Sequence, residues 1–219
     1  MSTPGRPPGR PSGRPRRPTL LGPVALDARQ GGTDPALRID AAHTTAAALV
    51  AHGRGSDDPS VTARLVAITD EHGIDEVAEL WSDRPAGTLP GALWRLYAVR
   101  AGIREQPESY ARAFELGRRR APVDEVLAGV ASPPTAEDVV VLADAVLTGA
   151  FDGDLAIALE RAAAFCRIVA TGWAVRADDL AESDDEPLAA RLTQTAAGLA
   201  KVAAELDDAA RLWRDERLS

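Results

Sequence analysis

Cysteine is almost missing from this 219-residue chain, which contains Cys166 alone. A single cysteine excludes an intramolecular disulfide and any metal cluster built mainly from thiolates. Such a chain fits a reducing compartment, and we therefore predict a cytoplasmic location. Cys166 falls on an apolar stripe, and the sequence shows no base beside it. This pattern predicts a small core residue and not a nucleophile.

Long hydrophobic runs are also missing. The apolar stretch Val139–Val146 is shorter than the roughly 18–20 residues that a membrane span needs, and it contains Asp144. The N-terminus is rich in arginine and proline but has no apolar segment after them, so it does not have the form of a secretory signal. We therefore predict no membrane association.

Aromatic residues make up only 4 % of the chain. Hydrophobic residues make up 45 %, and they are mainly alanine, leucine and valine. Alanine and leucine have the best helix propensities, so this bias points away from a β-rich fold. Lysine is nearly absent too, since Lys201 is the only lysine among 25 basic residues. A GC-rich coding sequence produces this excess of arginine, alanine, glycine and proline.

Sequence motifs of catalysis are lacking. The chain has no dinucleotide-binding or phosphate-binding glycine loop, no GxSxG and no HExxH. His43, His52 and His72 do not have metal-ligand spacing, and we predict no metal site and no cofactor. These observations favour a non-catalytic protein. They leave open an all-α enzyme whose site is assembled from scattered residues.

The net charge of −8 is unevenly distributed along the chain. Residues 1–30 carry six arginines against one aspartate, and residues 91–120 carry seven arginines against three glutamates. By contrast, residues 31–90 hold ten acidic and four basic side chains, and residues 121–219 hold nineteen acidic and eight basic ones. An acidic body repels a phosphate backbone, so any nucleic-acid affinity has to come from the two basic segments.

Helix start and stop signals organise the chain from residue 34 onward. Residues 1–33 contain seven prolines and few large apolar groups, which predicts a disordered arm. The pattern of residues 34–219 predicts one all-α bundle of about seven to nine helices. Thr135 and Asp138 have the spacing of a capping box. The run that follows, Val139–Leu142, is apolar on every side and fits either a central helix or a buried strand, and the cap favours the helix.

The last two helices are predicted to be the longest. We predict that Asp154 is the N-cap of a helix that runs to about Arg176. We predict an acidic link at residues 177–187 and a long C-terminal helix at residues 188–217. That last helix carries a stripe with a period of 3.5 residues, typical of a coiled coil. The stripe consists of Leu188, Leu192, Thr195, Leu199, Val202, Leu206, Ala209 and Trp213. Either the two helices pair with each other, or the last one meets its copy in a homodimer.

The N-terminal arm repeats Gly-Arg-Pro at Gly5, Gly9 and Gly13. This triplet resembles the centre of an AT-hook, which binds the minor groove of DNA. The hook usually has an arginine before the glycine, where this chain has Pro4, Pro8 and Ser12. Three interpretations stay open: a plain disordered tail, weak nonspecific contact with nucleic acid or an acidic protein, and a minor-groove reader. The contact residues would be Arg6, Arg10, Arg14, Arg16 and Arg17.

Two further groups of residues are candidates for binding. Arg118, Arg119 and Arg120 follow a helix end, where they complement the helix dipole or bind phosphate or an acidic segment. The acidic run at residues 182–186 offers them a partner within the chain or in another subunit. Trp94, Tyr97 and Asp144 form a candidate ligand patch, against the alternative that the aromatics are core.

From these features we predict a non-catalytic helical binding or regulatory protein with a basic flexible arm. The alternative is a helical bundle that binds a small molecule, or acts on one as an enzyme, near Trp94, Tyr97 and Asp144.

Overall fold

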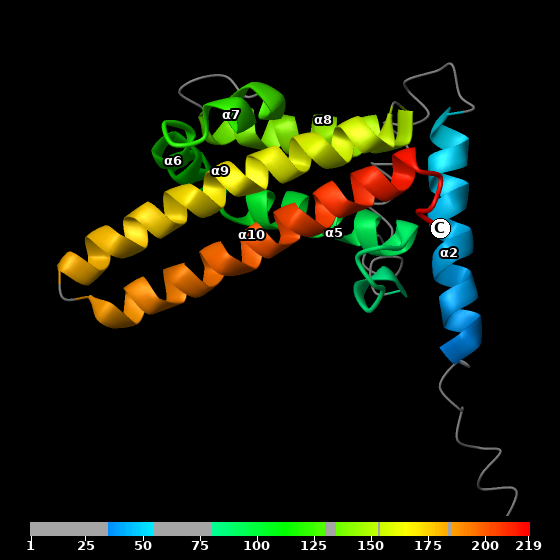
Figure 1. Ribbon diagram of the computed structural model, residues 1–219, viewed down its shortest axis with the longest axis horizontal. Helices are drawn as coiled ribbons and strands as arrows, with labels where there is room; N and C mark the ends of the chain where they lie inside the picture. The colour runs from blue at the N-terminus through cyan, green and yellow to red at the C-terminus, as the bar shows by residue number, and fades with distance from the viewer. Residues whose placement is uncertain (1–34, 55–79, 130–134, 153, 184) are drawn as a thin grey trace, which may run out of the picture. The chain divides into compact units, whose positions relative to one another are not determined.

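The computed structural model describes residues 35–54, 80–129, 135–152, 154–183 and 185–219 (Figure 1). All of these lie in one compact unit, Pro35–Ser219. The predicted arm at residues 1–33 lies outside the described residues, so it stays a prediction.

The fold is all-α, as the sequence predicts, and the described ranges contain no strand. They contain a bundle with a long C-terminal helix. The helices are α2 (Pro35–Arg54), α5 (Leu89–Glu105), α6 (Pro107–Arg118), α7 (Pro122–Ala128), α8 (Ala136–Asp152), α9 (Leu155–Glu182) and α10 (Glu186–Arg214).

Local capping bonds explain where three of these helices begin. The side chain of Thr88 accepts a hydrogen bond from the backbone N–H of Gly91, at 3.2 Å, and Asp154 accepts one from Ala156, at 2.8 Å. At the start of α8, Thr135 and Asp138 each accept a bond from the backbone N–H of the other. These contacts satisfy backbone donors that have no partner inside the helix. The predicted caps at Thr135 and Asp154 are confirmed, and the apolar run after Thr135 is a helix.

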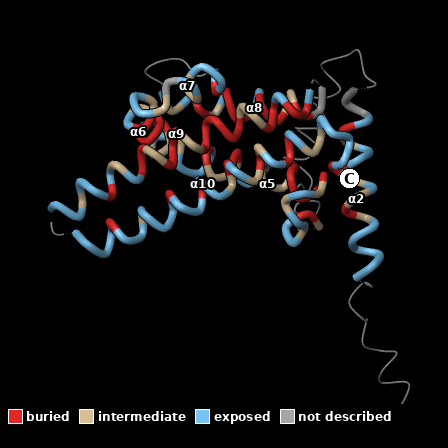
Figure 2. The backbone as a smooth tube through the Cα atoms, in the orientation of Figure 1, coloured by how far each residue is buried: buried red, intermediate tan, exposed pale blue. Residues whose placement is uncertain are grey.

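Helix α9 is the central element of the bundle. It packs against α6, α7, α8 and α10, and for this reason most of its length is buried (Figure 2). Aromatic rings fill its contact with α6: Phe165 stacks on Phe114 with centroids 5.5 Å apart, and Trp173 meets Tyr110 edge-on at 4.9 Å. The predicted core position of Cys166 is confirmed, since its side chain is fully buried.

Two glycines allow α6 and α9 to cross with their backbones in contact. A Cβ atom at position 117 would lie 1.9 Å from the carbonyl oxygen of Ile168. A Cβ atom at position 172 would lie 1.8 Å from the carbonyl oxygen of Ala113. No side chain fits at such distances, so only glycine permits this crossing.

The link between the last two helices is shorter than predicted. Helix α9 continues to Glu182, past the predicted end at Arg176, and α10 begins at Glu186. The predicted link of residues 177–187 is therefore wrong in its bounds, as is the helix range 188–217. Asp178, Asp179, Glu182 and Glu186 lie on exposed helix faces, where charge is no obstacle to a helix, while Ala177 is buried. Pro187 occupies the first turn of α10, which proline tolerates.

The predicted apolar stripe of α10 is wrong at its start and correct further along the helix. Leu188 and Thr195 are exposed, but Leu199, Leu206 and Ala209 are buried. Next to Leu188 and Thr195, alanines take the buried position one residue later, with a seven-residue spacing. They are Ala189, Ala196, Ala203 and Ala210. Small side chains let the two helices approach closely. Alanines therefore make this contact, whereas the sequence pattern predicted larger side chains there.

Helices α9 and α10 pair with each other as an antiparallel hairpin (Figure 1). Arg167 of α9 forms an ion pair with Asp207 of α10, and Arg214 of α10 donates to Glu160 of α9 at 2.7 Å. The sequence allowed these two helices to pair with each other or the last helix to pair with its copy, and the structure has the first pairing. A homodimer through the C-terminal helix stays a prediction.

We predict that Gly117→Ala and Gly172→Ala each lower the free energy of unfolding by at least about 3 kcal/mol, because a methyl group would push the two backbones apart. Gly198 is the matched control, since a Cβ atom there would have no neighbour within 4 Å. Gly198→Ala is expected to stabilise the protein by up to about 1 kcal/mol through helix propensity. Urea unfolding measures all three, and equal effects at the three sites would contradict the close crossing.

Candidate functional site

An open groove of about 330 Å³ lies between α5 and α6 on one side and α9 and α10 on the other. Its aromatic lining comes from three helices, with Trp94 on α5, Tyr110 on α6 and Trp173 on α9. Gly198 of α10 lies opposite and leaves the groove open, because it has no side chain. Pockets of this size and composition are typical of ligand sites.

The aromatic rings are held in place by one another. Tyr110 packs edge-on against Trp173 at 67°, and Trp94 lies 6.0 Å from Tyr97, centroid to centroid. Burial, with smaller contributions from Cys166 and Glu105, raises the pKa of Tyr110 to about 12. Its hydroxyl therefore stays neutral at physiological pH and is able to donate a hydrogen bond.

An ion pair forms the polar part of this groove. The Nε of Arg95 donates to Glu205 at 2.5 Å, and its Nη1 donates to the carbonyl oxygen of Gly91 at 2.8 Å. Lys201 lies 3.8 Å from the second carboxylate oxygen of Glu205. Because about a fifth of each side chain in the Arg95–Glu205 pair is exposed, both charges are available to a ligand in the groove. The groove thus combines an aromatic lining with one donor and one acceptor of opposite charge.

The predicted ligand patch is only partly assembled. Trp94 lines the groove and Tyr97 is its neighbour, but Asp144 lies elsewhere, where Arg100 donates to it at 2.6 Å and Arg104 lies at 3.5 Å. Trp94 and Arg100 are six residues apart on one helix, which rotates their side chains by about 120°. Asp144 neutralises the buried Arg100, whose exposed fraction is 4 %.

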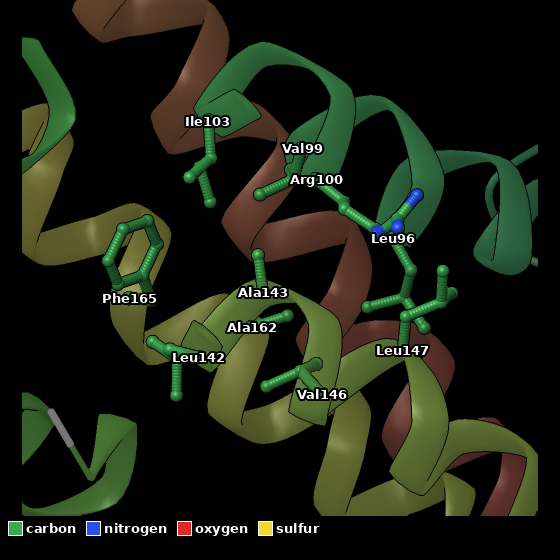
Figure 3. Close-up of a pocket in the computed structure, with 10 residues that line it drawn as sticks. All are labelled: Leu96, Val99, Arg100, Ile103, Leu142, Ala143, Val146, Leu147, Ala162 and Phe165. Atoms are coloured by element: carbon green, nitrogen blue, oxygen red, sulfur yellow. The ribbon is translucent and has the colours of Figure 1, made fainter. Parts of the chain in front are cut away.

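A second cavity lies next to Arg100, between α5, α8 and α9 (Figure 3). In Figure 3, Ala143 of α8 points toward Val99 of α5, and Phe165 of α9 closes one side. The enclosed space is only about 20 Å³. That is enough for about one water molecule, so this cavity is a packing gap and not a ligand site.

The three arginines after α6 have different environments. Arg118 donates to Glu115 at 2.6 Å and to Glu125 at 3.1 Å, and Arg119 lies 3.4 Å from Glu115. These bonds, with that of Arg118 the strongest, lower the pKa of Glu115. Arg120 is exposed and forms no ion pair within the described ranges. The other predicted anion contacts, Arg6, Arg10, Arg14, Arg16 and Arg17, lie outside the described residues.

Cys166 and Glu160, two described groups that could start nucleophilic or acid–base chemistry, have structural roles instead. Burial raises the pKa of the Cys166 thiol to about 12, which keeps it protonated and unreactive. Glu160 is bound by Arg214, whose hydrogen bonds lower its pKa. In the part of the chain that the structure describes, no cluster of three or more His, Cys, Asp or Glu side chains could hold a metal ion.

The sequence did not point to Tyr110, Trp173 or Gly198 as residues of one site. Tyr110 and Trp173 belong to apolar faces that a helical pattern assigns to the core. Of these three residues, Gly198 gave the clearest sequence signal of a site. A glycine inside a strong helix costs about 1 kcal/mol relative to alanine, so its presence there indicates a packing or functional role.

No protein-family model matches the chain, and no curated protein or solved structure matches it either. None of the described helices is long and apolar enough to cross a membrane. The function therefore has to be inferred from the geometry of this chain alone.

Proposed function

We propose that this chain is a non-catalytic helical binding protein whose ligand lies in the aromatic groove between α5, α6, α9 and α10. The observation that carries this proposal is that Trp94, Tyr110 and Trp173 line one open groove of about 330 Å³, with Trp94 and Tyr110 half-buried and Trp173 buried. Aromatic side chains gathered around one open groove commonly serve recognition.

The lining favours an elongated ligand with an aromatic or apolar part and one charged or polar end. The aromatic part would pack against the rings of Trp94 and Trp173. The polar end would reach the Arg95–Glu205 pair, where Arg95 offers a donor and Glu205 an acceptor. Glu205, the one carboxylate among the described residues that line the groove, is paired with Arg95. Cys166 lies outside this lining, and burial keeps its thiol protonated, so neither group is a primed nucleophile, which supports binding over catalysis.

Filling the groove tests this proposal. We predict that 1-anilinonaphthalene-8-sulfonate, an aromatic dye with one anionic group, binds the folded protein and quenches tryptophan emission. Gly198→Leu should weaken that binding at least about tenfold, because the new side chain enters the groove, and a tenfold change corresponds to about 1.4 kcal/mol. Fluorescence titration measures the affinity.

Gly149→Leu is the matched control. Gly149 is also a helical glycine with open space around it, but it lies on α8, away from the aromatic groove. This variant should bind the dye as the unmodified chain does. The proposal fails if the dye does not bind, or if the two leucine variants weaken binding equally.

The basic arm is the second part of the proposal. It would attach the acidic body to nucleic acid or another polyanion, because residues 1–30 carry six arginines against one aspartate. In the body, Arg118 and Arg119 are occupied by Glu115 and Glu125, which leaves the arm as the main cationic segment.

Replacing Arg6, Arg10, Arg14, Arg16 and Arg17 by glutamine tests the arm. We predict weak binding of duplex DNA by the unmodified chain, with an affinity that falls steeply as salt rises and is lost in the glutamine variant. Fluorescence anisotropy at several salt concentrations measures it. DNA binding that is the same in both chains would rule out this role.

A further inference from the structure

A second open groove, of about 600 Å³, lies between α7 and the α9–α10 hairpin. Its floor is made of small side chains, mainly Ala170 and Ala174 of α9 and Thr193 and Ala197 of α10. A floor of this kind lets another helix approach closely. Arg120 stands at its edge.

The outer face of α7 extends this groove with exposed apolar side chains. The exposed fractions are 72 % for Val123, 81 % for Val126 and 48 % for Leu127. Asp124 and Glu125, the acidic residues of α7, instead bond inward to arginines of α9 and α6. Arg167, which also lines the groove, pairs with Asp124 and with Asp207 of α10, so Arg120 is the lining charge that has no ion pair within the described ranges. The groove and the α7 face together are apolar, with a positive edge.

The tip of the α9–α10 hairpin has the complementary character. Residues 176–191 contain six acidic side chains against two arginines. Asp178, Asp179 and Glu182 are exposed, and none of them forms an ion pair in the described part of the chain. Leu188, with an exposed fraction of 43 %, adds an apolar group. Figure 1 shows this tip projecting beyond the other helices, and Figure 2 shows it largely exposed.

We propose that two copies of this chain pair through a two-fold axis, with the hairpin tip of each copy lying in the α7 groove of the other. The groove begins at Ala174 and Thr193, at the base of the tip. From Ala174, eight residues of helix, about 12 Å, reach Glu182 at the tip. In the other direction along α9, Ala170 lies one turn from Ala174 and also lines the groove, whose edge carries Arg120. An axis near Ala174 thus places the acidic tip of one copy beside Arg120 of the other.

The proposed contact is self-complementary, as a two-fold dimer requires. Each copy contributes one acidic tip and one groove with a positive edge, so both kinds of contact form twice. Alanine side chains would pack in the middle, and Leu188 would cover part of the apolar face of α7. The aromatic groove of the proposed function has a different lining, so dimerisation does not depend on ligand binding.

Charge reversal on the two surfaces tests this proposal in the full-length chain. Sedimentation velocity should show a monomer–dimer equilibrium that weakens as salt rises, because the charged contacts are exposed. Arg120→Glu, and separately Asp179→Arg with Glu182→Arg, should each raise the dimer dissociation constant at least about tenfold. An equimolar mixture of the two variants should recover dimers, because every reversed charge then faces its opposite.

Arg217→Glu is the control, since this exposed arginine lies at the other end of α10 and should leave the equilibrium unchanged. Circular dichroism verifies that each variant is folded. A protein that stays monomeric up to several hundred micromolar overturns the proposal. So do oligomers larger than a dimer, and so does a mixture of variants that fails to associate more strongly than either variant alone.

Discussion

The contact between the backbones of α6 and α9 is the constraint on which the rest of the structure depends. At Gly117 and Gly172 the two helices are so close that a methyl group on either would overlap a carbonyl oxygen of the other. This closeness brings Phe114 against Phe165 and Tyr110 against Trp173. Helices α7, α8 and α10 also pack on α9. The crossing therefore sets the positions of these three helices relative to α6, though not those of α2 and α5.

Both grooves follow from that arrangement. Helix α6 packs on α9, while α10 follows α9 along its whole length, so a space is left where α5 and α6 face the hairpin. Aromatic side chains line that space without filling it, and Gly198 keeps it open. On another side, α7 covers only part of the hairpin and leaves Ala174 and Ala197 of the groove floor exposed. Beyond the groove, the hairpin continues as a tip that α5, α6, α7 and α8 do not cover.

Local signals made much of the fold predictable from sequence. The caps at Thr88, Thr135 and Asp154 are short-range chemistry, and the structure has all three. The end of α9 was not predictable in this way, because the sequence of a helix with exposed acidic faces resembles the sequence of a solvated link between helices. The α10 contact was misjudged for a related reason: leucine marks burial clearly, whereas alanine occurs both on exposed faces and at close helix contacts. Pairings between distant residues, such as Arg95 with Glu205 or Tyr110 with Trp173, leave no trace in local sequence.

Amide hydrogen exchange tests the central role of the α6–α9 crossing most directly. Amides at the crossing, from Ala113 to Gly117 and from Ile168 to Gly172, should exchange only through global unfolding and so report the full free energy of unfolding. Amides of the hairpin tip, from Asp178 to Leu188, should exchange much faster through local opening, because few side chains there are buried. If the crossing exchanged as fast as the tip, α9 would not be the element that holds the bundle together.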